Sequence, residues 1–238
     1  MRRLDLELLE RGYADSRRRA QELIRGGLVQ VGGEMVTKPA RQVESSAAIT
    51  VSEHIDYVSR SAYKLAAANR RFEVDFQGTV VLDVGASTGG FSDYALRFGA
   101  KRVLAVDVGT HQLRQRLRTD PRIDVYEKTD IRDFRPDTLV DIALIDVSFI
   151  SLRQVIPNVA QSIQPNGHLL VLCKPQFEAG AAAKHKGVIK NERLRRQIFR
   201  DFEAWLQQQH LRLIDKADTD TPGSKGNRER FYWLDPSA

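Results

Sequence analysis

The stretch VVLDVGASTGGFSD, residues 80–93, decides how the chain folds. An apolar run typical of a buried strand reaches Asp83, and glycines follow at positions 85, 89 and 90. Glycines between a strand and a helix let backbone N–H groups approach a ligand closely. The spacing G-x-x-x-G-G differs from the G-x-G-x-x-G that seats a dinucleotide pyrophosphate. It therefore predicts a loop that holds a different ligand.

Short apolar runs recur after this stretch, and amphipathic segments lie between them. Residues 191–209 form the clearest amphipathic segment, and two final strands are expected in 211–219 and 228–234. Strand–helix alternation predicts an α/β fold, a doubly wound, Rossmann-like parallel sheet. The runs expected to form its first strands are 79–85, 102–109, 123–130, 141–148 and 168–175.

The first part of the chain has a different pattern. Two short helical segments end at Gly12 and at Gly26, and a hairpin signal surrounds Gly32 and Gly33. This pattern predicts a small α+β unit in front of the sheet. We therefore expect an N-terminal domain at 1–52, a bridge at 53–76 that begins the main domain, and the rest of the main domain at 77–238.

Composition narrows the class of protein. The formal net charge of +6 favours a polyanionic partner, although a merely basic enzyme is the alternative. The single cysteine excludes an internal disulfide, and the histidines show no metal-ligand spacing, so no metal is expected. No apolar run approaches the roughly 18 residues of a membrane span, and the N-terminus lacks the apolar core of a signal peptide. We expect a cytoplasmic protein with no membrane partner, and a monomer is favoured.

Acidic residues end most of the expected strands. In open α/β sheets the ligand lies beyond the carboxyl ends of the strands, where Asp83, Asp107, Asp130 and Asp146 are expected. Carboxylates repel a diphosphate but suit S-adenosylmethionine, which carries ribose hydroxyls, an amine, an ammonium and a sulfonium. An NAD site is the alternative, because Asp107 also stands where an NAD fold places its ribose acid. The expected cofactor-binding residues are Asp83, Gly85, Ser87, Gly89, Phe91, Asp107, Asp130 and Asp146.

Three consecutive arginines open the second helical segment of the N-terminal domain. They are either a solvated helix end or part of a nucleic-acid surface. The motifs L-L-x-x-G-x-x-x-S-R and L-I-x-x-G-x-V-x-V-x-G, followed by K-P, resemble the S4-type RNA-binding domain over nearly all of residues 3–51. This resemblance implies phosphate contacts by Arg17, Arg18, Arg19, Arg25 and Lys38.

Four motifs extend the resemblance to the rest of the chain. DVGASTGGFSD, DVSFISL, CKPQFE and GNRERF resemble the TlyA family, which joins an S4-type domain to an FtsJ-like 2'-O-ribose methyltransferase and also carries a hemolysin label. The resemblance implies methylation of ribosomal RNA, free or in ribosomal subunits, with S-adenosylmethionine as donor. It also implies a catalytic tetrad of Lys64, Asp146, Lys174 and Glu229. Ser61 and Asp130 stand where many relatives have glycine and asparagine.

The tetrad suits the chemistry of a ribose hydroxyl. This hydroxyl is a poor nucleophile until its proton leaves, and a neutral lysine amine can accept that proton. We expect Lys174 to be the base, and the glycine- and alanine-rich loop after it, up to residue 190, to close over RNA. Cys173 is expected to be a small core residue. The alternatives are a non-catalytic RNA-binding protein with a methyltransferase fold and a secreted cytolysin.

Overall fold

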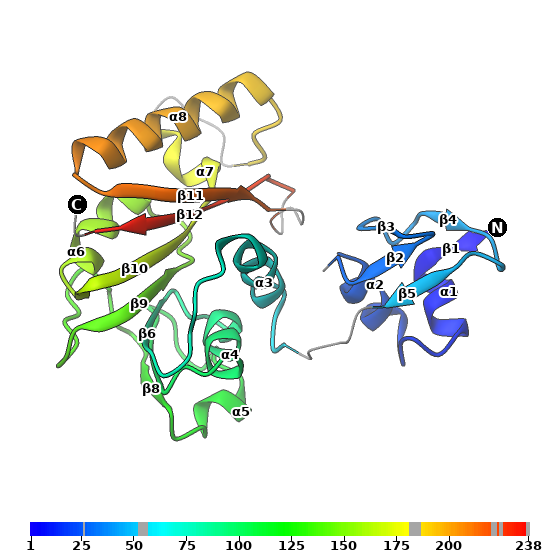
Figure 1. Cartoon of the computed structure of the whole chain (residues 1–238), viewed down its shortest axis with the longest axis horizontal. Coiled ribbons are helices and arrows are strands. Elements are labelled where there is room, and N and C mark those ends of the chain that lie inside the picture. The colour runs from blue at the N-terminus through cyan, green and yellow to red at the C-terminus, as the bar shows by residue number, and fades with distance from the viewer. Residues whose placement is uncertain (26, 52–56, 181–186, 220–222, 224–225, 237–238) are drawn as a thin grey trace.

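The described residues form three sheets, two small ones in an N-terminal unit and one large one in a second unit, as Figure 1 shows for the computed structural model of the chain. The structure describes residues 1–25, 27–51, 57–180, 187–219, 223 and 226–236. Much of the loop expected to close over RNA, residues 181–186, therefore lies outside the described residues.

The N-terminal unit combines two helices with very short strands. Its three-stranded sheet has the order β3-β2-β5, and β1 pairs with β4. The turn between β2 and β3 contains Gly32 and Gly33, both with positive φ, as a tight two-residue hairpin requires. The elements are β1 (Arg2–Arg3), α1 (Leu4–Glu10), α2 (Arg17–Arg25), β2 (Val29–Val31), β3 (Glu34–Met35), β4 (Gln42–Val43) and β5 (Ile49–Val51).

This unit has a hydrophobic core of its own. Leu4 and Leu8 of α1 pack with Leu23 and Ile24 of α2, and all four are at most 2 % exposed. Asp5 and Glu7 of α1 are buried too, where they bond to arginines.

A seven-stranded sheet forms the larger unit, with the order β11-β12-β10-β9-β6-β7-β8. Strands β6 to β10 are parallel to one another, and β12 is antiparallel to both β10 and β11. This mostly parallel α/β sheet confirms the predicted fold class. The strands are β6 (Val80–Val84), β7 (Arg102–Val106), β8 (Ile123–Tyr126), β9 (Val140–Ile145), β10 (Ile163–Cys173), β11 (Arg212–Asp218) and β12 (Arg230–Asp235).

Helices cover both faces of this sheet. Successive strand residues point to opposite faces, so Val81 joins a core with α3 and α4, whereas Leu82 joins a core with α6 and α8. Cys173 is fully buried in the second core, as predicted. The helices are α3 (Arg60–Phe72), α4 (Gly90–Arg97), α5 (Gln115–Arg118), η1 (Leu152–Gln154), α6 (Ile156–Ala160), α7 (Pro175–Glu178) and α8 (Glu192–Gln208).

The order of the strands reverses between β6 and β9. From β6 the chain continues through β7 to β8 on one side, and from β9 it continues to β10 on the other. The crevice beyond the carboxyl ends of strands at such a reversal is the usual ligand site of open α/β sheets. Among the described residues, no helix has the length and apolar character needed to cross a membrane.

Candidate active site

The glycine loop lies at this reversal, between β6 and α4. Gly85 has φ +79°, and a Cβ at this position would lie 2.6 Å from the carbonyl oxygen of Asp146. Only glycine lets the end of β6 come so close to the end of β9. At Gly90, a Cβ would meet the hydroxyls of Ser59 and Ser61, which are 2.7 Å apart. The loop therefore fits tightly between β9 and the start of α3, and Ser61 is accommodated there by its bond to Ser59.

Two predicted cofactor residues, Asp83 and Phe91, are buried beside this loop. The Asp83 carboxylate is 1 % exposed and accepts bonds from the Ser92 backbone N–H (2.9 Å) and hydroxyl (2.6 Å). Burial raises the pKa of Asp83 to about 7. Asp83 thereby fixes the first turn of α4. Asp83 and Phe91 both line a cavity of about 310 Å³ at the loop.

A second cavity of about 470 Å³ begins where β7 ends. The Asp107 carboxylate accepts bonds from the backbone N–H groups of Ser87 (2.8 Å) and Gly109 (2.7 Å), which fix its orientation. The two cavities share Gly85, Ser87 and Asp146, so they form one elongated crevice along the strand ends.

Asp130 lines the second cavity, although it does not end a strand. The strand expected at 123–130 ends at Tyr126, and a turn carries the chain on to Asp130. Hydrogen bonds from the Arg132 guanidinium to both carboxylate oxygens hold the pKa of Asp130 below its usual range. The Asp130 carboxylate is thus ionised, and Arg132 occupies part of its capacity to accept hydrogen bonds.

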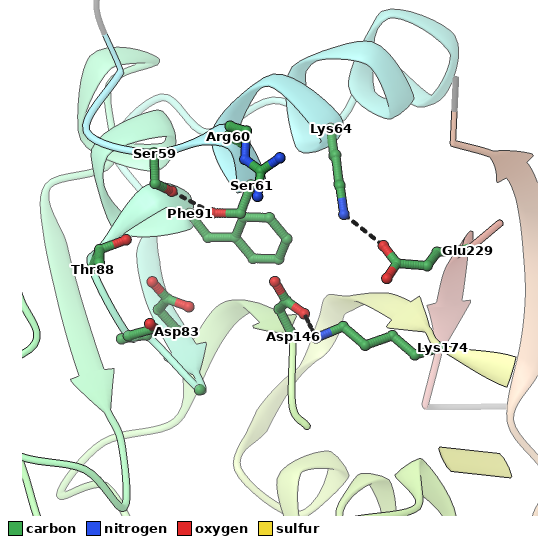
Figure 2. Close-up of a pocket in the computed structure, with 13 residues that line it drawn as sticks. Ser59, Arg60, Ser61, Lys64, Asp83, Thr88, Phe91, Asp146, Lys174 and Glu229 are labelled. Carbon is green, nitrogen blue, oxygen red and sulfur yellow. Dashed lines mark hydrogen bonds and ion pairs between the residues drawn. The ribbon is translucent and has the colours of Figure 1, made fainter. Parts of the chain in front are cut away.

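The four residues of the expected tetrad come together at one end of the first cavity (Figure 2). Lys64 extends from α3, and its Nζ donates to Glu229 Oε2 at 2.6 Å. Lys174 follows β10, and its Nζ lies 2.5 Å from Asp146 Oδ1, just beyond β9. The two ion pairs face the same space, with side chains of Lys64 and Lys174 only 12 % and 13 % exposed.

Sequence reasoning missed three polar residues of this site. Ser148 accepts a 3.0 Å bond from Lys174 Nζ, and Ser59 and Arg60 line the same cavity as the tetrad. Arg60 extends over the cavity in Figure 2. Ser148 could have been found, because it lies in the DVSFISL motif. Ser59 and Arg60 could not, because a serine and an arginine at the start of a helix indicate no particular function.

The crevice fits S-adenosylmethionine by the chemistry of its donors and acceptors. The loop that Gly85 and Gly89 allow to bend offers space at one end, and Asp107 offers two carboxylate oxygens farther along. An aspartate-rich crevice is unfavourable for a diphosphate and suitable for a cation with hydroxyls. Among the described residues, no group of three or more His, Cys, Asp or Glu side chains is arranged to hold a metal ion.

The five basic residues expected to contact RNA do not form one cluster. Arg18 and Arg19 line a cavity of about 890 Å³ together with Arg60 and Arg114 of the larger unit. Arg17 instead lies 3.2 Å from the buried Asp5 carboxylate. Arg25 donates to Gln21 within α2, and Lys38 is exposed between β3 and β4; neither they nor Arg17 line that cavity.

Family models match both units of the chain. The model described as FtsJ-like methyltransferase matches residues 57–235, and the S4 domain model matches residues 2–49. The methyltransferase model thus covers the unit with the seven-stranded sheet, and the S4 model covers the N-terminal unit.

Individual proteins match over almost the whole chain. The 16S/23S rRNA (cytidine-2'-O)-methyltransferase TlyA of Mycobacterium tuberculosis is 38 % identical over 98 % of this chain and 89 % of its own. Hemolysin A of Brachyspira hyodysenteriae is 35 % identical over 95 % and 97 %. A solved structure from Streptococcus thermophilus, also named a hemolysin, is 33 % identical with a TM-score of 0.73, over 98 % of this chain and 87 % of its own. The chain therefore belongs to the TlyA family, in which an S4 domain precedes an FtsJ-like, S-adenosylmethionine-dependent methyltransferase domain.

Proposed function

We propose that this protein methylates the ribose 2'-hydroxyl of a cytidine in ribosomal RNA. The observation that carries the proposal is the convergence of Lys64, Asp146, Lys174 and Glu229 on the cavity formed by the glycine loop. A non-catalytic RNA-binding protein has no use for two partly buried lysine–carboxylate pairs beside a cofactor crevice. The substrate is proposed because relatives at 38 % and 35 % identity are named for cytidine 2'-O-methylation of rRNA.

Each part of the crevice has a proposed role toward S-adenosylmethionine. Asp107 accepts bonds from the two ribose hydroxyls, because its carboxylate is already oriented by Ser87 and Gly109. Asp130 receives the adenine amine on a lone pair that Arg132 leaves available. The loop that contains Gly85, Ser87 and Gly89 lies against the methionine end of the cofactor, while the N–H groups of these residues donate within the protein, to Val106, Asp107 and Ala86. Asp83, Phe91 and Asp146 form the wall nearest the ammonium and the sulfonium.

The tetrad then acts on the ribose of the RNA. When bound, S-adenosylmethionine would supply an electrophilic methyl group to the 2'-oxygen. Lys174, when neutral, accepts the hydroxyl proton, and Asp146 and Ser148 fix the direction of its amine. Lys64 and Glu229 hold the ribose in line with the methyl group. Alignment alone can contribute about 7–11 kcal/mol to the acceleration.

The N-terminal domain supplies RNA affinity in this proposal. Arg18 and Arg19 contact backbone phosphates next to the catalytic unit, and Arg17, Arg25 and Lys38 contact phosphates on other parts of the domain. We propose that the protein works as a monomer in the cytoplasm, where ribosomal RNA is available.

The test is a map of 2'-O-methylation on ribosomal RNA from cells with and without the protein. The proposal predicts a cytidine that is methylated only when the protein is present, and that is restored by the wild-type chain but not by Lys174→Ala. Identical maps from the two kinds of cell would refute it.

A further inference from the structure

Glu178, at the end of α7, is a buried carboxylate to which the tetrad gives no role. Its side chain is 1 % exposed. Oε2 accepts a 2.7 Å bond from the Ser151 hydroxyl, and Oε1 accepts a 2.7 Å bond from the Leu152 backbone N–H. Both oxygens therefore hold the segment that follows Asp146, whereas Glu178 itself belongs to the segment that follows Lys174.

The backbone alone does not fix these two segments to each other. The ladder between β9 and β10 ends at the pair Ile145 and Val171, before either Asp146 or Lys174 is reached. Beyond that point, the contacts between the segments are made by side chains. Besides the hydrogen bonds of Glu178, they include its 3.9 Å ion pair with Arg153, the Lys174 contacts with Asp146 and Ser148, and a contact between the rings of Phe149 and Phe177, whose centroids are 5.3 Å apart.

The segment that Glu178 holds also needs an external support. Phe149 has φ +67°, a strained value for a residue with a side chain, and is 88 % exposed. Strained backbone persists only where the surroundings fix it. Two hydrogen bonds to the buried Glu178 carboxyl group provide such a support, at a place where an unpaired Leu152 N–H would be costly.

We propose that Glu178 is a positioning residue that ties residues 147–152 to α7 and thereby sets Asp146 and Lys174 at their working distance. The inference rests on the proposed function for the role of Lys174. Glu178 touches neither the substrate nor the reacting atoms; it acts through the two loops that carry them.

Two substitutions separate geometry from charge. Glu178→Ala removes both acceptors. Glu178→Gln keeps the shape, because the amide oxygen accepts from Leu152 and the amide nitrogen donates to the Ser151 hydroxyl. The matched control is Asp141→Ala, which removes a carboxylate bond to a backbone N–H, that of Val80 (2.7 Å), at the opposite end of β9.

The experiment measures single-turnover methyl transfer to ribosomal RNA with saturating cofactor and RNA. Glu178→Ala is expected to lower the rate about 100-fold, the cost of misplacing reacting groups by about 1 Å. Glu178→Gln should stay within about threefold of wild type, and Asp141→Ala should keep the wild-type rate. A Glu178→Ala rate within threefold of wild type overturns the proposal, and so does a Glu178→Gln rate as low as that of Glu178→Ala.

Hydrogen exchange at the Leu152 amide gives a readout that does not depend on activity. The proposal predicts faster exchange in Glu178→Ala and wild-type exchange in Glu178→Gln. If the wild-type protein methylates no RNA, the proposed function fails, while the exchange data still decide whether the tie exists. If Glu178→Ala does not fold, Ser151→Ala removes one of the two bonds, together with the 3.2 Å bond that Ser151 Oγ accepts from the Arg153 N–H. It is expected to lower the rate about tenfold. An unchanged rate in that variant overturns the proposal.

Discussion

The buried carboxyl of Asp83 makes the stability of the catalytic domain depend on pH. Burial raises its pKa from 3.8 to about 7. A raised pKa means that the folded state favours the protonated acid, so the stabilisation is complete below pH about 4 and is lost as the pH rises through about 7. Three pKa units at 1.36 kcal/mol each correspond to about 4 kcal/mol in all. About 2.5 kcal/mol of this stabilisation is lost between pH 5 and pH 8. The rest is lost below pH 5, because the carboxyl group of the unfolded chain is already largely ionised at pH 5.

Asp83→Asn isolates this effect. Asparagine has the same shape, can accept the same bonds from Ser92, and does not ionise. Relative to wild type, the variant should gain about 2.5 kcal/mol in free energy of unfolding between pH 5 and pH 8.

The assay is urea unfolding without cofactor, at several pH values, followed by tryptophan fluorescence. Both tryptophans, Trp205 and Trp233, lie in the catalytic domain, so the signal reports on that domain. The difference between the two proteins cancels every other titrating group that they share. Parallel pH curves for wild type and Asp83→Asn would refute the reasoning, because Asp83 would then have the same pKa in the folded and unfolded states.

Three further predictions concern the active site and the RNA surface. Lys174→Ala and Lys174→Arg should both abolish methyl transfer while cofactor and RNA still bind, since a guanidinium does not release its proton near neutral pH; a near-normal single-turnover rate in either variant would exclude Lys174 as the base. Asp107→Ala should weaken binding of S-adenosylhomocysteine by about 1–3 kcal/mol in calorimetry, and NAD should not bind the wild-type protein; equal binding of NAD would contradict the cofactor assignment. Changing Arg18 and Arg19 together to alanine should lower RNA affinity and reduce the slope of log affinity against log salt by about 1–2, whereas Arg122→Ala should not; an unchanged slope would mean that these arginines are only a solvated helix end.

The sequence predicted the sheet well because its strands are buried on both faces. Largely apolar runs such as 80–84 and 102–106 seldom occur outside buried strands. Residues at the carboxyl ends of these runs line the crevice. Several strand boundaries were wrong. The strands expected at 102–109, 123–130 and 141–148 end at Val106, Tyr126 and Ile145. The strand expected at 168–175 begins at Ile163 and passes through the turn-forming residues Pro165 and Gly167. An irregular register between Ile163 and His168 accommodates them, and local propensity does not reveal such a register shift.

The pairing of polar side chains was harder to predict. The tetrad residues were identified by resemblance, but their contacts join positions far apart in the chain. Likewise, Glu178 and Ser151 belong to two motifs that resemblance named separately, and only the parallel alignment of β9 and β10 brings them within bonding distance. The same is true of Arg17, whose bond to buried Asp5 depends on how α1 and α2 pack.

The contact between Lys64 and Glu229 spans 165 positions, whereas the strands of the N-terminal domain pair only with one another, within residues 2–51. Domains fold as units, the N-terminal one first, while the chain emerges from the ribosome. The RNA-binding domain is thus complete long before Glu229 has been synthesised. A chain that stops short of that residue retains the means to hold RNA without the means to modify it. Such a fragment would occupy the target and compete with the intact enzyme.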